Sequence, residues 1–222
     1  MTETNARPGA RGSRPGRPGP MSGRQAEAAR NDQRILDSAR AVFVADPGAP
    51  ITAVAKHAGV GISALYTRYG SKEELLRKLC TDGLELVVAE TEAALADRRD
   101  DWIVFTTFME RLVAADTSSI TLALAGTFAP TPDMFALADR SNRLMGEFFE
   151  RIRQALRPGL SVHDISLVFE LVAAVKLASP ERTAQLRQRY LAVILSGMRP
   201  SAAGDLPGPP PSWQDISERW RT

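Results

Sequence analysis

Apolar residues recur at helical spacing along most of this chain, and this periodicity restricts the fold more than any other feature of the sequence. Ile35, Leu36, Ala39, Val42 and Phe43 lie at positions i, i+1, i+4, i+7 and i+8, which is one face of a helix. No segment alternates between apolar and polar residues for long enough to predict a strand. The sequence therefore predicts an all-α protein.

Proline and glycine residues divide this pattern into separate helices. We predict a first helix from near Glu27 to Asp46-Pro47-Gly48, and then helices over 51–58, 62–69, 72–96, 101–115, 117–127, 132–156, 162–178 and 180–198. Ser71 and Glu74 form a capping-box sequence, in which each side chain bonds to the backbone N–H of the other residue. Residues 200–222 read as a Pro-rich linker and a short C-terminal helix, with Trp213, Ile216 and Trp220 behind a candidate cap at Ser212; a frayed end is the alternative.

The charge of the chain is unevenly distributed. The net charge is +2, but the first 80 residues hold 13 basic and 7 acidic side chains, and the remainder holds 15 basic and 19 acidic ones. Residues 1–26 are rich in Arg, Pro and Gly, and they predict a disordered basic tail because they cannot bury enough apolar surface. A basic N-terminal third favours a polyanionic partner, and a tail that only keeps the protein soluble is the alternative.

Several classes of site are excluded by composition. Cys80 is the only cysteine, so no intramolecular disulfide forms, which fits a reducing compartment such as the cytoplasm. His57 and His163 are the only histidines, which excludes a zinc site built from Cys and His clusters, and we expect no metal. No run of apolar residues is long enough to span a membrane. No Gly-rich phosphate loop, nucleophile elbow or His–carboxylate pairing is present, so we expect neither an enzyme nor a cofactor.

The stretch Ile51–Leu75 carries the functional signal. Two short helices joined at Gly59 predict a helix-turn-helix, in which Ala55 allows close packing and Gly59 permits the turn. Val60 and Leu65 would fill the space between the helices. In such a motif the second helix projects its N-terminal side chains into the major groove of DNA.

A family resemblance is carried by residues at fixed spacing in and around the helix-turn-helix: Ile35, Ala39, Phe43, Val54-Ala55, Ala58-Gly59-Val60, Leu65-Tyr66, Tyr69 and Ser71-Lys72-Glu73-Glu74-Leu75. In these positions the chain resembles the TetR-like family of bacterial transcriptional regulators, whereas beyond residue 80 only length and helical architecture agree. The resemblance implies a helix-turn-helix domain over 27–80 and a helical effector-binding and dimerisation domain over 81–199. It also implies a homodimer that binds a double-stranded DNA operator, most often as a repressor released by a small hydrophobic effector.

The resemblance assigns DNA contacts one residue at a time. Tyr66 and Lys72 correspond to residues that contact phosphates, and Arg68 lies where another backbone contact is common; ordinary solvated charges at Arg68 and Lys72 are the alternative. Candidates for contact with base edges lie on the exposed face of the second helix, and they are Ile62, Ser63 and Thr67.

Two positions depart from the family pattern. Pro50 replaces the usual Ser or Thr at the start of the first helix of the motif, and Thr52 is the candidate substitute for its phosphate contact. Gly61 replaces the Ser that usually precedes the second helix; it caps acceptably but has no side chain for a phosphate. Arginines of the N-terminal tail could restore the lost affinity, as basic arms do in other DNA-binding proteins.

The body of the chain offers two further sets of candidates. An apolar effector pocket is suggested by aromatic and Met residues of the middle helices, with plain core packing as the alternative: Trp102, Phe105, Phe108, Met109, Phe128, Met145 and Phe149. A dimer interface is suggested by the last two long helices, which are apolar on two sides, with burial inside a monomer as the alternative: Phe169, Val172, Leu186, Tyr190 and Ile194. Two other function classes stay open, a helical adaptor that binds other proteins and an all-helical enzyme.

Overall fold

The structure, a computed structural model, describes residues 23–200 and 205–217. The regular elements of these two ranges are all helical, which confirms the all-α prediction. They are α1 (Gly23–Ala45), α2 (Ile51–Ala58), α3 (Ile62–Tyr69), α4 (Lys72–Ala96), α5 (Asp101–Ala115), α6 (Thr117–Leu124), α7 (Pro132–Ile152), the 3₁₀ turn η1 (Arg153–Ala155), α8 (Val162–Ala173), α9 (Pro180–Gly197) and α10 (Trp213–Ser217). The predicted basic tail up to residue 22 and Trp220 lie outside the described residues.

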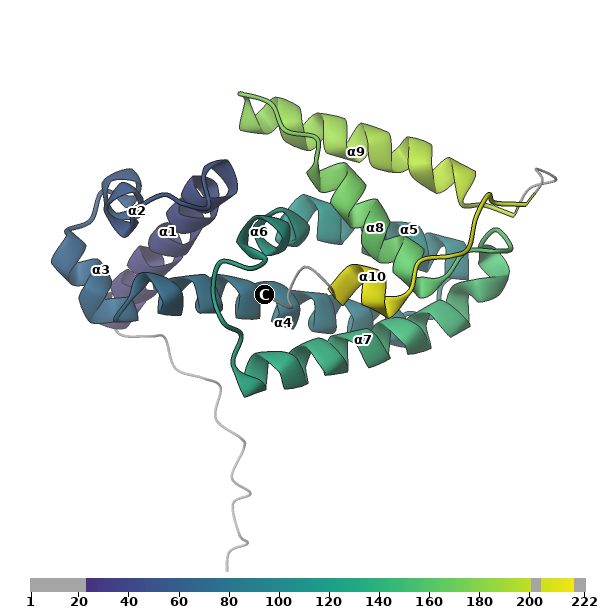
Figure 1. The fold of residues 1–222 in the computed structure, drawn as a ribbon, viewed down its shortest axis with the longest axis horizontal. Helices are drawn as coiled ribbons and strands as arrows, with labels where there is room; N and C mark the ends of the chain where they lie inside the picture. The colour runs from purple at the N-terminus through teal and green to yellow at the C-terminus, as the bar shows by residue number, and fades with distance from the viewer. Residues whose placement is uncertain (1–22, 201–204, 218–222) are drawn as a thin grey trace, which may run out of the picture.

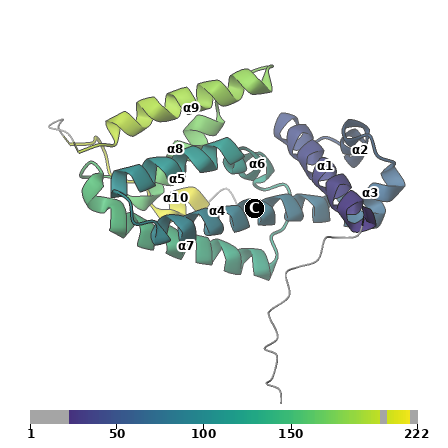
Figure 2. The same ribbon diagram turned by 180° about the vertical axis from the view of Figure 1, so that it is seen from behind.

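The helices form a small N-terminal group and a larger body (Figure 1). Helices α1–α3 lie at one end of the molecule, and α4 runs from them into the body, where it packs along α7. Helix α9 packs against α5 and α8 along one edge of the body, which Figure 2 shows from behind. This arrangement is the predicted one, an N-terminal helix-turn-helix followed by a helical domain.

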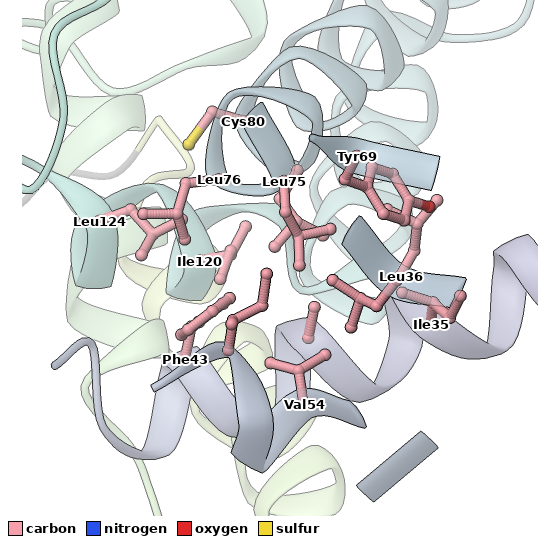
Figure 3. Packing of buried hydrophobic residues seen from close by; sticks show 14 of the residues in the cluster. Ile35, Leu36, Phe43, Val54, Tyr69, Leu75, Leu76, Cys80, Ile120 and Leu124 are labelled. Atoms are coloured by element: carbon pink, nitrogen blue, oxygen red, sulfur yellow. The ribbon is translucent and has the colours of Figure 1, made fainter. Parts of the chain in front are cut away.

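One apolar cluster holds the N-terminal group together and joins it to the body (Figure 3). Phe43 of α1, Leu65 of α3 and Leu75 of α4 are fully buried in it. Ile120 and Leu124 of α6 enter the same cluster. Because burial of one such side chain stabilises a fold by about 1.5–3 kcal/mol, α6 is firmly attached to α1 and α4.

A second apolar cluster fills the body. Phe105, Phe108 and Phe148 are buried at its centre, and the rings of Phe108 and Phe148 lie 4.9 Å apart between centroids at a tilt of 59°. Such tilted pairs are favourable for aromatic quadrupoles. Leu191 and Leu195 of α9 complete the cluster from the side of the last long helix.

Helix α8 ends earlier than predicted, at Ala173 instead of residue 178. The guanidinium of Arg187, from α9, donates hydrogen bonds to the carbonyl oxygens of Ala173 at 2.9 Å and Val175 at 3.0 Å. These bonds satisfy carbonyl groups that a longer helix would have paired internally, so the chain turns there. The partner lies in another helix, which is why the local sequence pattern did not reveal the end.

Other helix boundaries also differ from the prediction. Helix α1 begins at Gly23, ahead of the predicted start near Glu27. Helix α6 ends at Leu124 instead of residue 127, and the predicted helix over 132–156 changes to a 3₁₀ turn after Ile152. The expected short C-terminal helix is α10, where Asp215 accepts hydrogen bonds from the backbone N–H of Ser212 at 2.7 Å and from its hydroxyl at 2.7 Å.

Only one half of the predicted capping box at α4 forms. The hydroxyl of Ser71 accepts a hydrogen bond from the backbone N–H of Glu74 at 3.1 Å. The N–H of Ser71 donates instead to the carbonyl of Tyr69 at 2.7 Å. Because this donor is already engaged by the tight turn after α3, the carboxylate of Glu74 does not take it.

Candidate nucleic-acid interface

The turn between α2 and α3 has the geometry that the sequence predicted. Gly59 adopts a left-handed conformation with φ 67° and ψ 34°, which is unfavourable for a residue that has a Cβ atom. The N–H of Val60 donates to the carbonyl of Ala55 at 3.0 Å. Arg34 of α1 adds a hydrogen bond to the carbonyl of Ala58 at 2.7 Å, which fixes the end of α2 against α1.

Helix α3 has one buried and one exposed face. Leu65 and Tyr69 point into the N-terminal cluster. The candidate residues Ser63, Tyr66, Thr67 and Arg68 are exposed on the opposite face, and Tyr66 keeps 46% of its surface accessible. Ile62, also a candidate, is partly buried against the cluster. The structure thus brings four of the predicted DNA-contact residues to one accessible helix face.

The two hydroxyl groups on this face are not equivalent. The hydroxyl of Thr67 donates to the carbonyl of Ser63 at 2.8 Å, within its own helix. Ser63 lies near the start of α3, whose N-cap is Gly61. Thr52, the other candidate hydroxyl of the motif, is exposed on α2. Since N-terminal residues of a recognition helix reach deepest into a groove, Ser63 is the better placed hydroxyl for a base edge.

Arg68 is held by a carboxylate that no sequence motif indicated. Asp32 of α1 accepts hydrogen bonds from Nε of Arg68 at 2.8 Å and from Nη2 at 2.9 Å, and Tyr69 donates its hydroxyl to the same carboxylate at 2.5 Å. The hydrogen bonds from Arg68 lower the pKa of Asp32 to about 2. Burial raises the pKa of Tyr69, and its hydrogen bond to Asp32 adds to the shift. The position of α3 on α1 is therefore fixed by charge as well as by packing.

Lys72 serves the loop between α1 and α2. Its Nζ atom donates to the carbonyl oxygens of Ala49 at 2.8 Å and Pro47 at 3.3 Å, and it lies 5.2 Å from the centre of the Phe43 ring. The lysine therefore stabilises the start of the motif, a role that the resemblance did not indicate. Lys72 is also the first residue of α4, and the backbone donors at the N-terminus of a helix favour an anion.

The candidate effector residues pack in the two apolar clusters, and of the seven only Phe108 lines either of the two hollows described below. Six of them belong to the cluster of the body or pack against it: Trp102, Phe105, Phe108, Met109, Met145 and Phe149. Phe128 lies instead in the N-terminal cluster. Two small hollows among the described residues hold about 20 and 10 Å³, room for about one water molecule each. The first lies between α4 and α5, and the second beside Asp116, Phe169 and Arg187.

The candidate dimer residues divide into buried and accessible ones. Val172 is buried in the body, and Phe169 packs on Phe108 with 6.3 Å between ring centroids. Tyr190 is about half exposed, and Leu186 and Ile194 are partly buried. The most accessible apolar side chains of this region are others, Leu171 at 64% and Val193 at 63% exposed. The sequence pattern shows that these helices are apolar on two sides, but it does not show which side faces the core, so it could not identify Leu171 and Val193 as the accessible ones.

Two broad negative findings concern the described residues. Among the helices of residues 23–200 and 205–217, none is long and apolar enough to cross a membrane. Within the same ranges, no group of three or more His, Cys, Asp or Glu side chains could hold a metal ion.

In the comparison with known protein families, a stretch of the N-terminal region matches a family model. Residues 35–79 match the family model of bacterial regulatory proteins, tetR family. The match covers the C-terminal half of α1, the helix-turn-helix and the first turns of α4. It is a family of regulators and not of enzymes. No curated protein matches the sequence.

Three of the similar solved structures match the fold of this chain over almost their whole length. The ketosteroid transcriptional regulator KstR2 of Mycobacterium tuberculosis has 19% identity and a TM-score of 0.59, covering 78% of this chain and 96% of its own. The TetR-like regulator LfrR of Mycobacterium smegmatis, solved with proflavine, has 23% identity and a TM-score of 0.58, covering 80% and 99%. The TetR-family regulator PfmR of Thermus thermophilus has 23% identity and a TM-score of 0.55, covering 77% and 97%. At these identities the likeness is one of fold.

Proposed function

Residues 35–79 match the DNA-binding domain of the tetR family. On this basis, we propose that the chain is a sequence-specific DNA-binding transcriptional regulator that acts as a homodimeric repressor. The observation that carries the proposal is the accessible face of α3. It presents two hydroxyls, a phenol and a guanidinium, while Leu65 and Tyr69 anchor the helix from behind. A helix held in this way can enter a major groove without losing its own support.

The contacts proposed for DNA follow from the position of each side chain. Ser63 and Ile62 near the start of α3 would meet base edges, and Tyr66 would contact a phosphate. A guanidinium has five N–H donors, so the two hydrogen bonds of Arg68 to Asp32 leave other donors for a phosphate oxygen. Thr52, exposed on α2, would approach the DNA backbone beside the contacts of Tyr66 and Arg68.

The proposed dimer uses the accessible apolar residues of α8 and α9 and of the segment between them. Leu171, Leu177, Tyr190 and Val193 are all about half exposed or more. Burying such a surface against its copy in a second chain favours association. A two-fold dimer would then present two α3 helices to successive major grooves, which are about 34–36 Å apart.

The proposed effector is a small hydrophobic molecule that enters the core of the body. Met109 and Met145 lie among the aromatic side chains there, and Met side chains adapt their shape readily. Because the core is closed, a ligand would have to separate α5 and α7, and the movement would reach α1 through α6. LfrR, whose fold is similar, was solved in complex with proflavine. Ligand binding and operator binding would then weaken each other by the same factor.

The experiment that tests the proposal measures binding to DNA that flanks the chain's own gene, with a scrambled duplex of equal composition as control. A specific regulator should bind one segment more tightly than the scrambled duplex, by roughly a thousandfold or more. Equal affinity for both duplexes at each salt concentration would instead favour a protein-binding adaptor. Compounds that quench the tryptophan fluorescence of the chain are then added to the complex, and an inducer must release the operator at the concentration that quenches.

A further inference from the structure

A polar contact joins the segment after α8 to the end of α1. Nζ of Lys176 donates to the carbonyl oxygen of Val44 at 2.6 Å, although the two residues are 132 positions apart. In both views, the connection between α8 and α9 lies near the end of α1 (Figures 1 and 2). The contact therefore links the helices proposed for dimerisation with the helix-turn-helix group.

The acceptor is well suited to a cation. Val44 lies in the last turn of α1, where carbonyl groups lack partners within the helix. The partial negative charge at a helix C-terminus also attracts an ammonium group. The last turn of α1 holds no basic residue of its own. Lys176 therefore supplies a cation from the body to this helix end, in addition to Lys72 of α4, which bonds to the loop after it.

The other end of this contact is rigidly attached to α9. Arg187 is buried, and it donates to the carbonyl of Val175, the residue before Lys176, at 3.0 Å. The hydroxyl of Thr183 accepts a hydrogen bond from the N–H of Leu177 at 3.0 Å and donates to the carbonyl of Ser179 at 2.9 Å. The backbone on both sides of Lys176 is thus fixed to α9.

Arg187 extends the connection to the body. Its guanidinium also forms an ion pair with Asp116, at 2.6 Å, at the junction of α5 and α6. Asp116 has a positive φ of 52°, so this junction is a tight turn held by a specific partner. Helix α6 in turn packs on α1 in the N-terminal cluster. Besides the continuous helix α4, the helix-turn-helix group therefore meets the body at an apolar contact through α6 and at a polar contact through Lys176.

We infer that Lys176 is a positioning residue, which fixes the direction of the helix-turn-helix group relative to α9. Helix α4 and the apolar contact through α6 already hold the group on the body, and the exposed hydrogen bond of Lys176 adds a directional contact that favours one alignment of α1 with α9. In the homodimer this alignment sets the separation of the two α3 helices, and therefore the spacing of the operator half-sites that the dimer prefers. This last step rests on the proposed function.

The first test needs no DNA. Spin labels on His57→Cys of α2 and Asp139→Cys of α7 report the distance between the helix-turn-helix group and the body; Cys80 is buried, and burial raises its pKa to about 12, so labelling is confined to the introduced thiols. Lys176→Met should broaden the distance distribution, because it keeps the stem and removes the donor. Lys176→Arg should restore the original width, and Arg143→Met, which removes a charge from the exposed face of α7, should leave it unchanged. An unchanged width in Lys176→Met overturns the inference.

The second test uses the operator and the same operator with one base pair inserted at its centre. Lys176→Met should reduce the preference for the original spacing by roughly two- to tenfold, the scale of one hydrogen bond. Lys176→Arg should keep most of the preference, and base preference within a half-site should not change. A preference for spacing that survives in Lys176→Met contradicts the assigned role. If the unmodified chain binds no duplex specifically, the proposed function fails, while the distance measurement still decides the role of Lys176.

Discussion

The carboxylate of Asp32 in α1 holds the guanidinium of Arg68 in α3 through two hydrogen bonds, of 2.8 and 2.9 Å. Paired hydrogen bonds between charged groups of this shape are among the strongest in proteins. Tyr69 donates to the same carboxylate from the buried side of α3. The helix proposed to read DNA is therefore tied to α1 by the residue that would also contact a phosphate.

Replacing Asp32 by Asn should lower the free energy of unfolding by about 1 kcal/mol or less at neutral pH, because the Arg68 side chain is 61% exposed and solvent screens the pair. The pKa of Asp32 is depressed in the folded state, from 3.8 to about 2. Its contribution is therefore fully present above the ordinary pKa and is lost as the pH falls through the folded value. Urea unfolding of both proteins should show a stability difference that shrinks between pH 4 and pH 2. The control Asp37→Asn breaks a longer, exposed contact with Arg40 at 3.6 Å and should change less.

Replacing Lys72 by Met should weaken both the fold and the binding of DNA. Stability should fall by about 1 kcal/mol, because the carbonyls of Pro47 and Ala49 lose a charged donor. Specific and non-specific duplexes should lose affinity alike, and the salt slope should fall by about one. Tyr66→Phe is the comparison, since loss of a neutral hydroxyl should reduce affinity with little change of slope. A change of base preference in Lys72→Met would show that Lys72 does not act on phosphates.

Replacing Ser63 by Ala should relax the preference at one base pair, by roughly 1–3 kcal/mol, and leave the salt slope unchanged. Thr67→Val is the matched variant. Its hydroxyl is bonded to the carbonyl of Ser63, so its loss should alter base preference less. Binding curves on point-substituted operators measure both effects. The reverse order, with Thr67 controlling preference, would mean that α3 enters the groove in another orientation.

Replacing Gly61 by Ser should raise stability by a few tenths of a kcal/mol and increase affinity for DNA. Gly61 caps α3 with φ −66° and ψ 139°, which any residue can adopt, and a Cβ atom there meets no atom within 4 Å. The new hydroxyl could also donate to a phosphate. Gly59→Ser is the contrasting variant and should destabilise, because Gly59 has a φ of 67°. Lower affinity in a stably folded Gly61→Ser would place this helix start away from the DNA backbone.

Replacing Val193 by Glu should give folded monomers that bind the operator poorly. Val193 is 63% exposed in the single chain, so the charge meets water there and is unfavourable only against a second chain. Phe169→Glu should unfold the body instead, because this ring packs on Phe108. Phe135→Glu, at an exposed site of α7, should leave the mass unchanged. Light scattering and circular dichroism separate these outcomes, and a dimeric Val193→Glu would exclude this surface as the interface.

The sequence by itself determined the local structure of the motif. The helical periods around Ala55 and Leu65 and the need for a residue without Cβ at Gly59 depend on neighbours a few positions away. The outward position of Tyr66 follows from the same period, because Leu65 and Tyr69 must face the core. The family match over residues 35–79 covers the same region, where function depends on short-range spacing.

Only the tertiary structure decided which charged groups meet. Asp32 and Arg68 are 36 positions apart, and Lys176 and Val44 are 132 apart, so no local pattern links them. It also decided that Val172 is buried and Val193 accessible, since both lie on apolar helices and only the direction of the core distinguishes them. Local propensity fixes which face of a helix is apolar, but the packing of other helices determines how much of that face remains exposed and which side chains reach across.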